Sequence, residues 1–376
     1  MSRNNENIPV MDRQFFQGNS LIFGAFLAYT ACAMIFFLYN GLYEYVNFKI
    51  YKASYFVIFA VLLVFRFACY VLANRVRRGY YLDWKNIVPD LRENWLNLNV
   101  LFTVFMPLLG ISFMMSIFGS VKTLFPMVNP FYLDVPLMEL DRALHFGSHP
   151  WELTHALFGS SMATEVLDFM YQLWFVLLMG FSVWMVSNHK MGHLRTKFLL
   201  CYILTWSILG TFLAVLLPAA GPCYYANFVD GFNVYAPLMD RIHEISDAIK
   251  GVDGETGLYT VRNQELLWSF YTDDYIGLGS GITAMPSMHV SFATLFYLTI
   301  REMNAKLGYL ALLYLVIIQV TSVHLGWHYA VDGYVSIILT YGLWKCSGWL
   351  VARVCGAEQV VNPDNQDQYQ PQAQIG

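Results

Sequence analysis

Hydrophobic residues in this chain fall into long runs that are separated by shorter polar stretches. A helix needs about 20 mostly apolar residues to cross the hydrocarbon core of a bilayer. The runs that approach this length are Leu21–Leu38, Ser54–Leu72, Val100–Phe118, Val166–Val186, Phe198–Leu217, Met285–Thr299, Gly308–Thr321 and Tyr329–Leu350. The pattern predicts an all-α protein, a polytopic membrane helix bundle of about eight spans.

The composition supports a membrane protein. Hydrophobic residues make up 57% of the chain and charged residues 13%, whereas a soluble domain carries about 25% charged residues. A net charge of -4 without a basic run excludes a nucleic-acid partner. The six cysteines form no C-x-x-C pair, so neither a zinc ribbon nor a disulfide framework is indicated.

Lysine and arginine gather in three of the predicted loops, and such loops face the cytoplasm. The residues are Arg75, Arg77, Arg78, Lys85, Lys190, Arg195, Lys197, Arg301 and Lys306. If every span crosses once, both termini lie on that side. The loops 39–53, 119–165, 218–284 and 322–328 then face a periplasm, the cell exterior or an organelle lumen, and the sequence leaves open which.

Two of the loops on the non-cytoplasmic side have helical apolar spacing. Within 218–284, the segment Ala236–Ile249 repeats apolar residues every three to four positions, and Leu133–His155 has a similar pattern. Both are predicted to form amphipathic helices at the membrane interface. The tail from Val360 is rich in Asn, Gln, Asp and Pro and is predicted to be disordered.

The sixth span opens with Pro286-Ser287-Met288-His289. Proline is favoured in the first turn of a helix, and the free N–H groups of that turn bind anions such as phosphate. Ser287 adds a hydroxyl donor. Histidine is costly inside hydrocarbon, so His289, one turn into the span, is a candidate functional residue.

The eighth span opens from the same side of the membrane. His328 and Asp332 are four residues apart, so a helix places them on one face as neighbours. A carboxylate that holds the proton of one ring nitrogen leaves the other nitrogen free to attack. His324 lies one turn nearer to solvent, where it fits either an interfacial residue or a substrate contact.

Two groups of polar residues could have a purely structural role instead of a functional one. The two histidines and Asp332 could tie helices together as a buried polar cluster, but three such groups at matched depth favour chemistry. A second group, in the segment 141–155, fits either a metal site or a solvated helix face, and comprises Asp141, Arg142, His145, His149 and His155. Its spacing matches no known ligand pattern, so neither a metal nor another cofactor is expected.

Pro286-Ser287-x-His289 followed by His328-x-x-x-Asp332 resembles the type 2 phosphatidic acid phosphatase superfamily. The resemblance implies that His328 is a nucleophile that attacks phosphorus. It also implies that Asp332 orients His328 and that His289 protonates the leaving oxygen. The implied organisation is a cytoplasmic segment 1–20, two additional spans in 21–99, a catalytic six-helix core in 100–350 and a disordered cytoplasmic tail 351–376.

The chain departs from the family pattern at the cationic positions. Ala214 and Gly221 stand where the family places a lysine and an arginine, and Thr321-Ser322 replaces Ser-Arg. The branch resembling inositol phosphorylceramide synthases, which are phosphotransferases of sphingolipid metabolism, also lacks these cations. Its likeness extends to Gly221-Pro222-x-Tyr224-Tyr225, which implies substrate contacts at Tyr224 and Tyr225.

The resemblance therefore implies an enzyme that works through a phosphohistidine. A phospholipid is the donor, and a lipid or polyol hydroxyl is the acceptor if the enzyme is a phosphotransferase. Water is the acceptor if it is a lipid phosphate phosphatase. A transporter or scramblase is the alternative of another class, but no pair of Gly- or Pro-broken spans occupies matching halves of the chain. The oligomeric state is open.

Overall fold

The computed structural model describes residues 13–48, 51–78, 89, 98–188, 191–253, 257–273 and 279–356. The tail from Val360, which was predicted to be disordered, lies outside these residues. Lys85 and Lys190, which were used to predict the orientation, also lie outside them. Within them the chain is helical, with no strand. The all-α prediction is confirmed.

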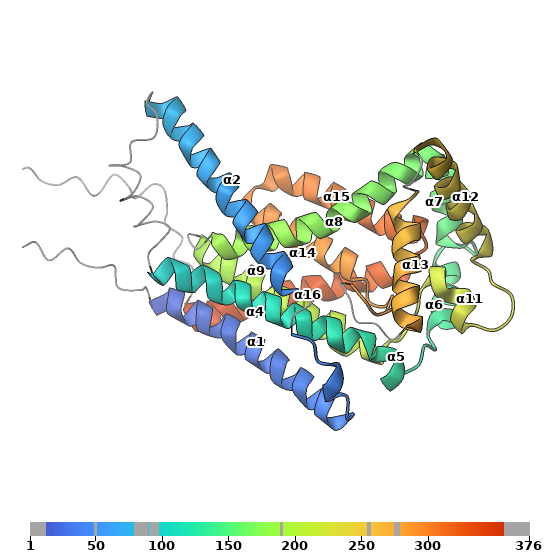
Figure 1. Cartoon of the computed structure of the whole chain (residues 1–376), viewed down its shortest axis with the longest axis horizontal. Helices are drawn as coiled ribbons and strands as arrows, with labels where there is room; N and C mark the ends of the chain where they lie inside the picture. Colours follow the sequence, from blue (N-terminus) through green and yellow to red (C-terminus); the bar gives the residue numbers. More distant parts are fainter. Residues whose placement is uncertain are drawn as a thin grey trace, which may run out of the picture.

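The long helices coincide with the predicted apolar runs. They are α1 (Arg13–Tyr39), α2 (Lys52–Arg78), α4 (Leu98–Thr123), α8 (Ser161–Ser187), α9 (Gly192–Leu204), α14 (Met288–Met303), α15 (Ala305–His324) and α16 (Ala330–Cys355). Helix α9 continues through the π-helical η3 (Thr205–Leu213) into α10 (Ala214–Leu216). Their axes run broadly along the length of the molecule, with α2 tilted away from the rest (Figure 1).

Among the residues that the structure describes, six helices are long and apolar enough to cross a membrane, so the predicted count of about eight spans is not confirmed. Helix α14 has only 16 residues because Asn304 ends it and Ser287 caps its beginning. In α2 the apolar stretch found among the described residues is Ala53–Val64, which is shorter than a membrane span. The six spans establish an integral membrane protein, while its orientation remains a prediction.

Short helices cover one end of the bundle (Figure 1). They are α5 (Phe125–Val128), α6 (Asp134–Leu144), α7 (Pro150–Phe158), α11 (Tyr225–Phe228), α12 (Ala236–Asp253) and α13 (Tyr259–Thr272), with the single turns η1 (Tyr43–Tyr45) and η4 (Pro222–Tyr224). Both predicted amphipathic segments are helical. The first of them, Leu133–His155, is split into α6 and α7 at Gly147, whose φ is 90°.

The covering helices bury an apolar face against the bundle. Leu238, Ile242 and Ile245 of α12 are almost fully buried, in one cluster with Tyr329 at the start of α16. The long helices, in contrast, present exposed apolar side chains outward, such as Leu27 and Ile338. Such a surface is typical of contact with lipid. The covered end is therefore a folded layer that meets the bundle where α14 and α16 begin.

Two cations that were used to predict orientation are engaged within the bundle. The buried guanidinium of Arg195 donates to the carbonyls of Val186 and Thr103 and to the side chain of Asn19. Lys197 lies 2.6 Å from the carboxylate of Glu302. The contacts of these two cations join α1, α4, α8 and α14. Both side chains therefore contribute to the packing of these helices.

Candidate active site

The two histidines that were predicted from sequence lie at the covered end of the bundle. His289 is in the first turn of α14, and His328 immediately precedes α16. Their ring centroids are 6.3 Å apart, with 60° between the ring planes. Helices α14 and α16 thus bring the two imidazoles together because both helices begin at this end.

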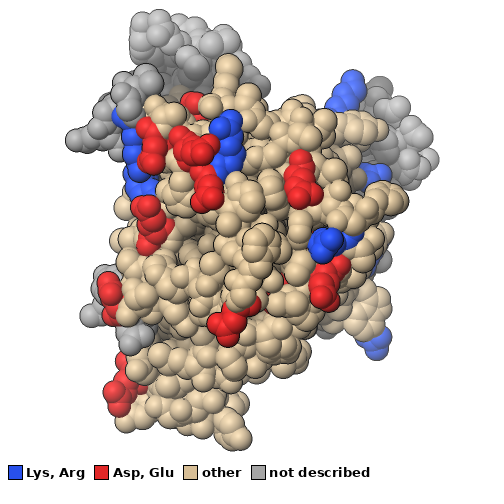
Figure 2. Space-filling view, turned by 90° about the vertical axis from the view of Figure 1, so that its right-hand side faces the viewer, with Lys and Arg blue, Asp and Glu red and all other residues tan. Residues whose placement is uncertain are grey.

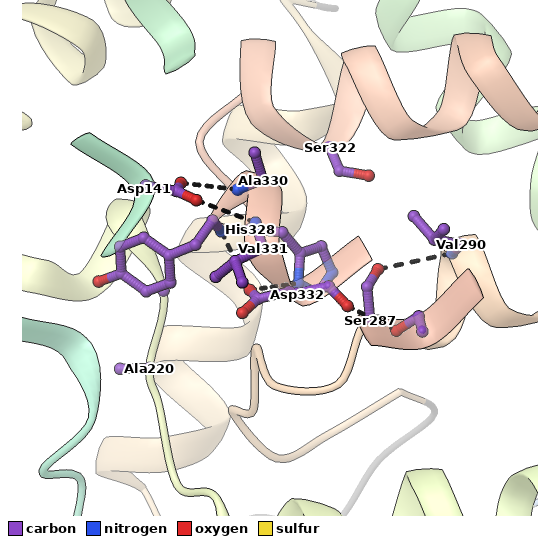
Figure 3. Close-up of polar contacts among 12 residues, drawn as sticks. Asp141, Ala220, Ser287, Val290, Ser322, His328, Ala330, Val331 and Asp332 are labelled. Carbon is purple, nitrogen blue, oxygen red and sulfur yellow. Dashed lines mark hydrogen bonds and ion pairs between the residues drawn. The ribbon is translucent and has the colours of Figure 1, made fainter. Parts of the chain in front are cut away.

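His328 is paired with the carboxylate of Asp332, which lies in the first turn of α16. Its Nδ1 lies 3.3 Å from Oδ2 of Asp332, which is fully buried and also accepts the backbone N–H of Tyr329 (Figure 3). A carboxylate at Nδ1 selects the tautomer that leaves Nε2 without a proton. His328 remains 8% exposed, and its ring lines a cavity.

Aromatic side chains of α8 surround His289. The ring of Tyr171 stacks on it at a centroid distance of 4.2 Å, and that of Trp174 lies at 4.1 Å. The indole N–H of Trp174 also donates to the backbone carbonyl of His289. Nε2 of His289 is buried and has no hydrogen-bond partner among the described residues. That nitrogen is therefore available to a ligand.

A cavity of about 440 Å³ opens beside both imidazoles. Its walls come from the start of α2, the end of α4, the middle of α8, the loop 279–286 and the residues that precede α16. Several lining residues carry a buried polar atom with no partner in the described part of the chain, namely Tyr171, Gln172, Trp206, Thr283 and His289. Buried polar groups are normally satisfied, so these atoms indicate a site for a polar ligand.

Two carboxylates of α6 hold the backbone around His328. Asp141 accepts the N–H groups of Ala330 and Val331 at the start of α16, at 2.7 and 2.9 Å (Figure 3). Asp134 accepts the N–H groups of residues 220 and 221 and the hydroxyl of Tyr329. Anionic side chains stabilise helix N-termini, so Asp141 fixes the first turn of α16, which carries Asp332.

Sequence reasoning missed this role of α6. Asp134, Leu137 and Asp141 are buried on one face of the helix, as expected for residues spaced by three, four and seven positions. Two aspartates on the apolar stripe of an amphipathic helix are the signal that could have revealed it. The prediction of a solvated face is wrong at Asp141, which is 1% exposed.

Four further residues were predicted to contact the substrate, and the structure places them differently. Tyr224 lines the cavity, and its hydroxyl donates to the carbonyl of Gln264. Ser287 is buried and caps α14 through the N–H of Val290 (Figure 3). Among the described residues that line the cavity, neither Tyr225 nor His324 is present.

His324 has a packing role instead of a contact with the cavity. Its Nε2 lies 3.1 Å from the hydroxyl of Thr164, and its ring stacks on His155 at 4.0 Å. Tyr225 is buried in the apolar cluster beneath α12. In the part of the chain that the structure describes, no group of His, Cys, Asp and Glu side chains is arranged to hold a metal ion.

The position that corresponds to a family arginine cannot hold a side chain in this backbone. Gly221 has a φ of 93°, and a Cβ there would lie 2.7 Å from the carbonyl oxygen of Trp327. The close approach is reinforced by the N–H of Cys223, which donates to the carbonyl of Gly326. Glycine at 221 thus lets the segment after α10 pack directly against the loop that carries His328.

Replacement of Asp141 by asparagine is expected to lower the free energy of unfolding by about 1–3 kcal/mol, because an amide N–H₂ then faces backbone donors. The deficit should grow at acidic pH. Burial raises the pKa of Asp141 to about 6, against the opposing effect of its bonds to Ala330 and Val331. Between pH 4 and 6 the carboxyl of Asp141 thus keeps its proton in the folded protein, whereas the unfolded chain releases it. This proton binding stabilises the folded wild type at acidic pH, and the stabilisation is lost as pH rises through 6.

Thermal unfolding of wild type and of Asp141→Asn in detergent, at pH 4.5 and at pH 7, measures the difference in stability between them. Glu139→Gln is the matched control, because Glu139 is an exposed acid on the same helix. A deficit of Asp141→Asn that is equal to that of the control at both pH values would refute the capping role of Asp141.

Comparison with known proteins places the site in a family. Searches of curated proteins and of solved structures found no match to the chain. The family model of the PAP2 superfamily matches residues 135–346. The match begins within α6, ends within α16 and includes both histidines and Asp332. Because it spans more than half of the chain, the protein belongs to the PAP2 superfamily, whose members are phosphatases or phosphotransferases that act on lipid phosphates in membranes.

Proposed function

We propose that this protein is a phospholipid headgroup phosphotransferase of the inositol phosphorylceramide synthase type, with His328 as its nucleophile. The observation that supports this most is the shared cavity, which is lined by both His289 and His328. Asp332 pairs with Nδ1 of His328, which leaves Nε2 as the nitrogen that attacks. We also propose that this end of the bundle faces the non-cytoplasmic side.

In the first step, the Nε2 lone pair of His328 attacks the phosphorus of the donor. The P–N bond forms while the P–O bond to the lipid alcohol breaks, and protonated His289 gives its proton to the departing oxygen. The headgroup phosphate is then attached to His328, and the free lipid alcohol leaves. Asp332 stabilises the positive charge that develops on the His328 ring.

In the second step, the hydroxyl of an acceptor lipid or polyol attacks the same phosphorus. Neutral His289 removes the hydroxyl proton, the P–O bond forms, and the P–N bond to His328 breaks. Both imidazoles return to their starting protonation states. The mechanism uses protein groups for every proton transfer, and it requires no metal ion.

Transfer is favoured over hydrolysis by the walls of the cavity. Aromatic and aliphatic side chains dominate the lining, including Phe118, Phe175 and Leu178. Such walls suit an acceptor with an apolar body, whose binding excludes water from the phosphohistidine. The lipid phosphate phosphatase is the second candidate, because the same three residues serve either acceptor.

The test is an incubation of purified protein with headgroup-labelled phosphatidylinositol, with and without ceramide. We expect a new labelled phospholipid only when the lipid hydroxyl is present, and we expect equal turnover after treatment with a chelator. Release of labelled phosphoinositol without an acceptor would assign hydrolysis. Absence of turnover with every donor and acceptor, or its loss on chelation, would contradict the proposed mechanism.

A further inference from the structure

A lysine from outside the family-matched region faces the proposed reaction centre. Lys122 is in the last turn of α4, thirteen residues before the PAP2 match begins, and it lines the same cavity as His289 and His328. The sequence pattern placed Lys122 in the loop 119–165, after the predicted span Val100–Phe118, and gave it no role, whereas it belongs to α4.

The ammonium group of Lys122 has no counter-ion among the described residues of this site. Among the described residues that line the cavity there is no Asp or Glu, and Lys122 is the one Lys or Arg. No hydrogen bond or ion pair joins its Nζ to another described residue. A partly buried ammonium without a counter-ion is destabilising, so an anionic ligand that enters this cavity gains a strong interaction.

The backbone of Lys122 is held in place by the loop that precedes α14. Gly281 has a φ of 89°, and a Cβ on it would lie 2.8 Å from the carbonyl oxygen of Lys122. This close contact connects the end of α4 to the segment that leads into Pro286 and His289. The end of α4 and the loop that leads to His289 are therefore close in space, although they are far apart in sequence.

Three other cations of the covering helices have contacts outside the cavity. Arg241 contacts Glu244 and Lys250 contacts Asp247, both on the outer surface of α12, and Arg262 lies over the ring of Tyr259. Figure 2 shows acidic and basic side chains interspersed over this end of the molecule. None of these three residues is among the described residues that line the cavity.

We propose that Lys122 binds the phosphate of the substrate and replaces the cationic clamp that is missing at Ala214, Gly221 and Ser322. This inference rests on the proposed function. A lysine is a compact point charge that binds phosphate oxygens. From the end of α4 it neutralises the charge of the phosphate while His328 attacks and His289 protonates the leaving oxygen.

The number of cations also bears on the class of substrate. A phosphodiester carries one negative charge, whereas a phosphomonoester carries about 1.5 to 2 at neutral pH. One lysine balances a diester, and a monoester would leave a second charge uncompensated in an apolar cavity. Lys122 thus favours a diester phospholipid over phosphatidic acid as the donor.

The test compares Lys122→Met and Lys122→Arg with wild type, using labelled phosphatidylinositol and labelled phosphatidic acid as donors. We expect Lys122→Met to lower kcat/KM for phosphatidylinositol by about 100-fold, as for the loss of one charge-stabilising donor. Lys122→Arg should stay within about tenfold of wild type, since the charge remains. Wild type should prefer phosphatidylinositol. Lys250→Met, which removes an exposed lysine of α12, is the matched control and should have no effect.

Thermal stabilisation by orthovanadate, a phosphate analogue, provides a readout that does not depend on turnover. We expect vanadate to raise the unfolding temperature of wild type and of Lys250→Met, and to have little effect on Lys122→Met. If Lys122→Met does not fold, Lys122→Gln takes its place, with the same expected losses. Equal kcat/KM and equal vanadate stabilisation in wild type and the neutral variant would overturn the inference.

The two proposals fail in different ways. Activity in His328→Ala contradicts the proposed function whatever the Lys122 variants do. Activity that depends on His328 but is insensitive to Lys122→Met leaves the function intact and refutes the role of Lys122 alone. A wild-type preference for phosphatidic acid would refute the assignment of a diester donor.

Discussion

Replacement of His328 by alanine is expected to lower kcat for headgroup transfer by about 10⁴-fold or more, the loss that follows removal of a catalytic nucleophile. No other described residue that lines the cavity combines a neighbouring carboxylate, here at 3.3 Å, with a second ring nitrogen that is free. Among the described lining residues, the other imidazole belongs to His289, whose ring is enclosed between Tyr171 and Trp174.

The intermediate provides a direct measurement. Wild type that is quenched with base during turnover should retain the labelled headgroup on the protein, because a P–N bond to histidine survives base and is broken by acid. His328→Ala should retain none. His243→Ala is the matched control, since His243 is an exposed histidine of α12 that bonds to the carbonyl of Met239. Covalent label in His328→Ala at the wild-type level would show that another residue is the nucleophile.

Sequence patterns predicted the long helices well because each one is an apolar run with a clear polar boundary. They also predicted that His328 and Asp332 are neighbours, and the two side chains lie 3.3 Å apart although His328 precedes α16 instead of sharing a helix face with Asp332. The approach of His289 to His328 could be anticipated because both residues begin helices that enter from the same side. These are local properties, or simple consequences of how the chain crosses the bilayer.

The residues that sequence reasoning missed depend on contacts between distant segments. The bonds from Asp141 to α16 span about half the chain, and nothing near Asp141 in sequence reveals that α6 lies across the start of that helix. The position of Lys122 also depends on a contact between distant segments, because the loop at Gly281 connects the end of α4 to the segment before His289. His324 was considered for substrate contact from its spacing, but the stacking partner that it has, His155, lies in α7.

Carboxylates that cap helices of other segments recur at this end of the molecule. Asp168 of α8 accepts the N–H groups of Tyr259 and Thr260 at the start of α13, in the same manner as Asp141 does for α16. Each bond connects a covering helix to a membrane-spanning one. The consequence is a rigid frame around the cavity, and such rigidity keeps catalytic groups in productive geometry.

Replacement of His289 by glutamine is expected to lower kcat for phosphatidylinositol by about 10² to 10⁴-fold, the usual contribution of a general acid or base. The size of the loss should depend on the donor. An aryl donor, such as a 4-nitrophenyl phosphodiester, releases a stable nitrophenolate that needs no proton. His289→Gln should therefore complete the first step with this donor and then stop, because the acceptor hydroxyl still requires a base.

The expected result is a burst of about one nitrophenolate per enzyme, followed by slow turnover, which single-turnover absorbance measurements detect. His328→Ala should show no burst, and His243→Gln should behave as wild type does. Nε2 of His289 has no hydrogen-bond partner among the described residues, so the variant breaks no hydrogen bond of that nitrogen, although the ring contacts with Tyr171 and Trp174 are lost. An equal loss of the first step with both donors would exclude His289 as the proton donor, and it would assign the residue to packing between α8 and α14.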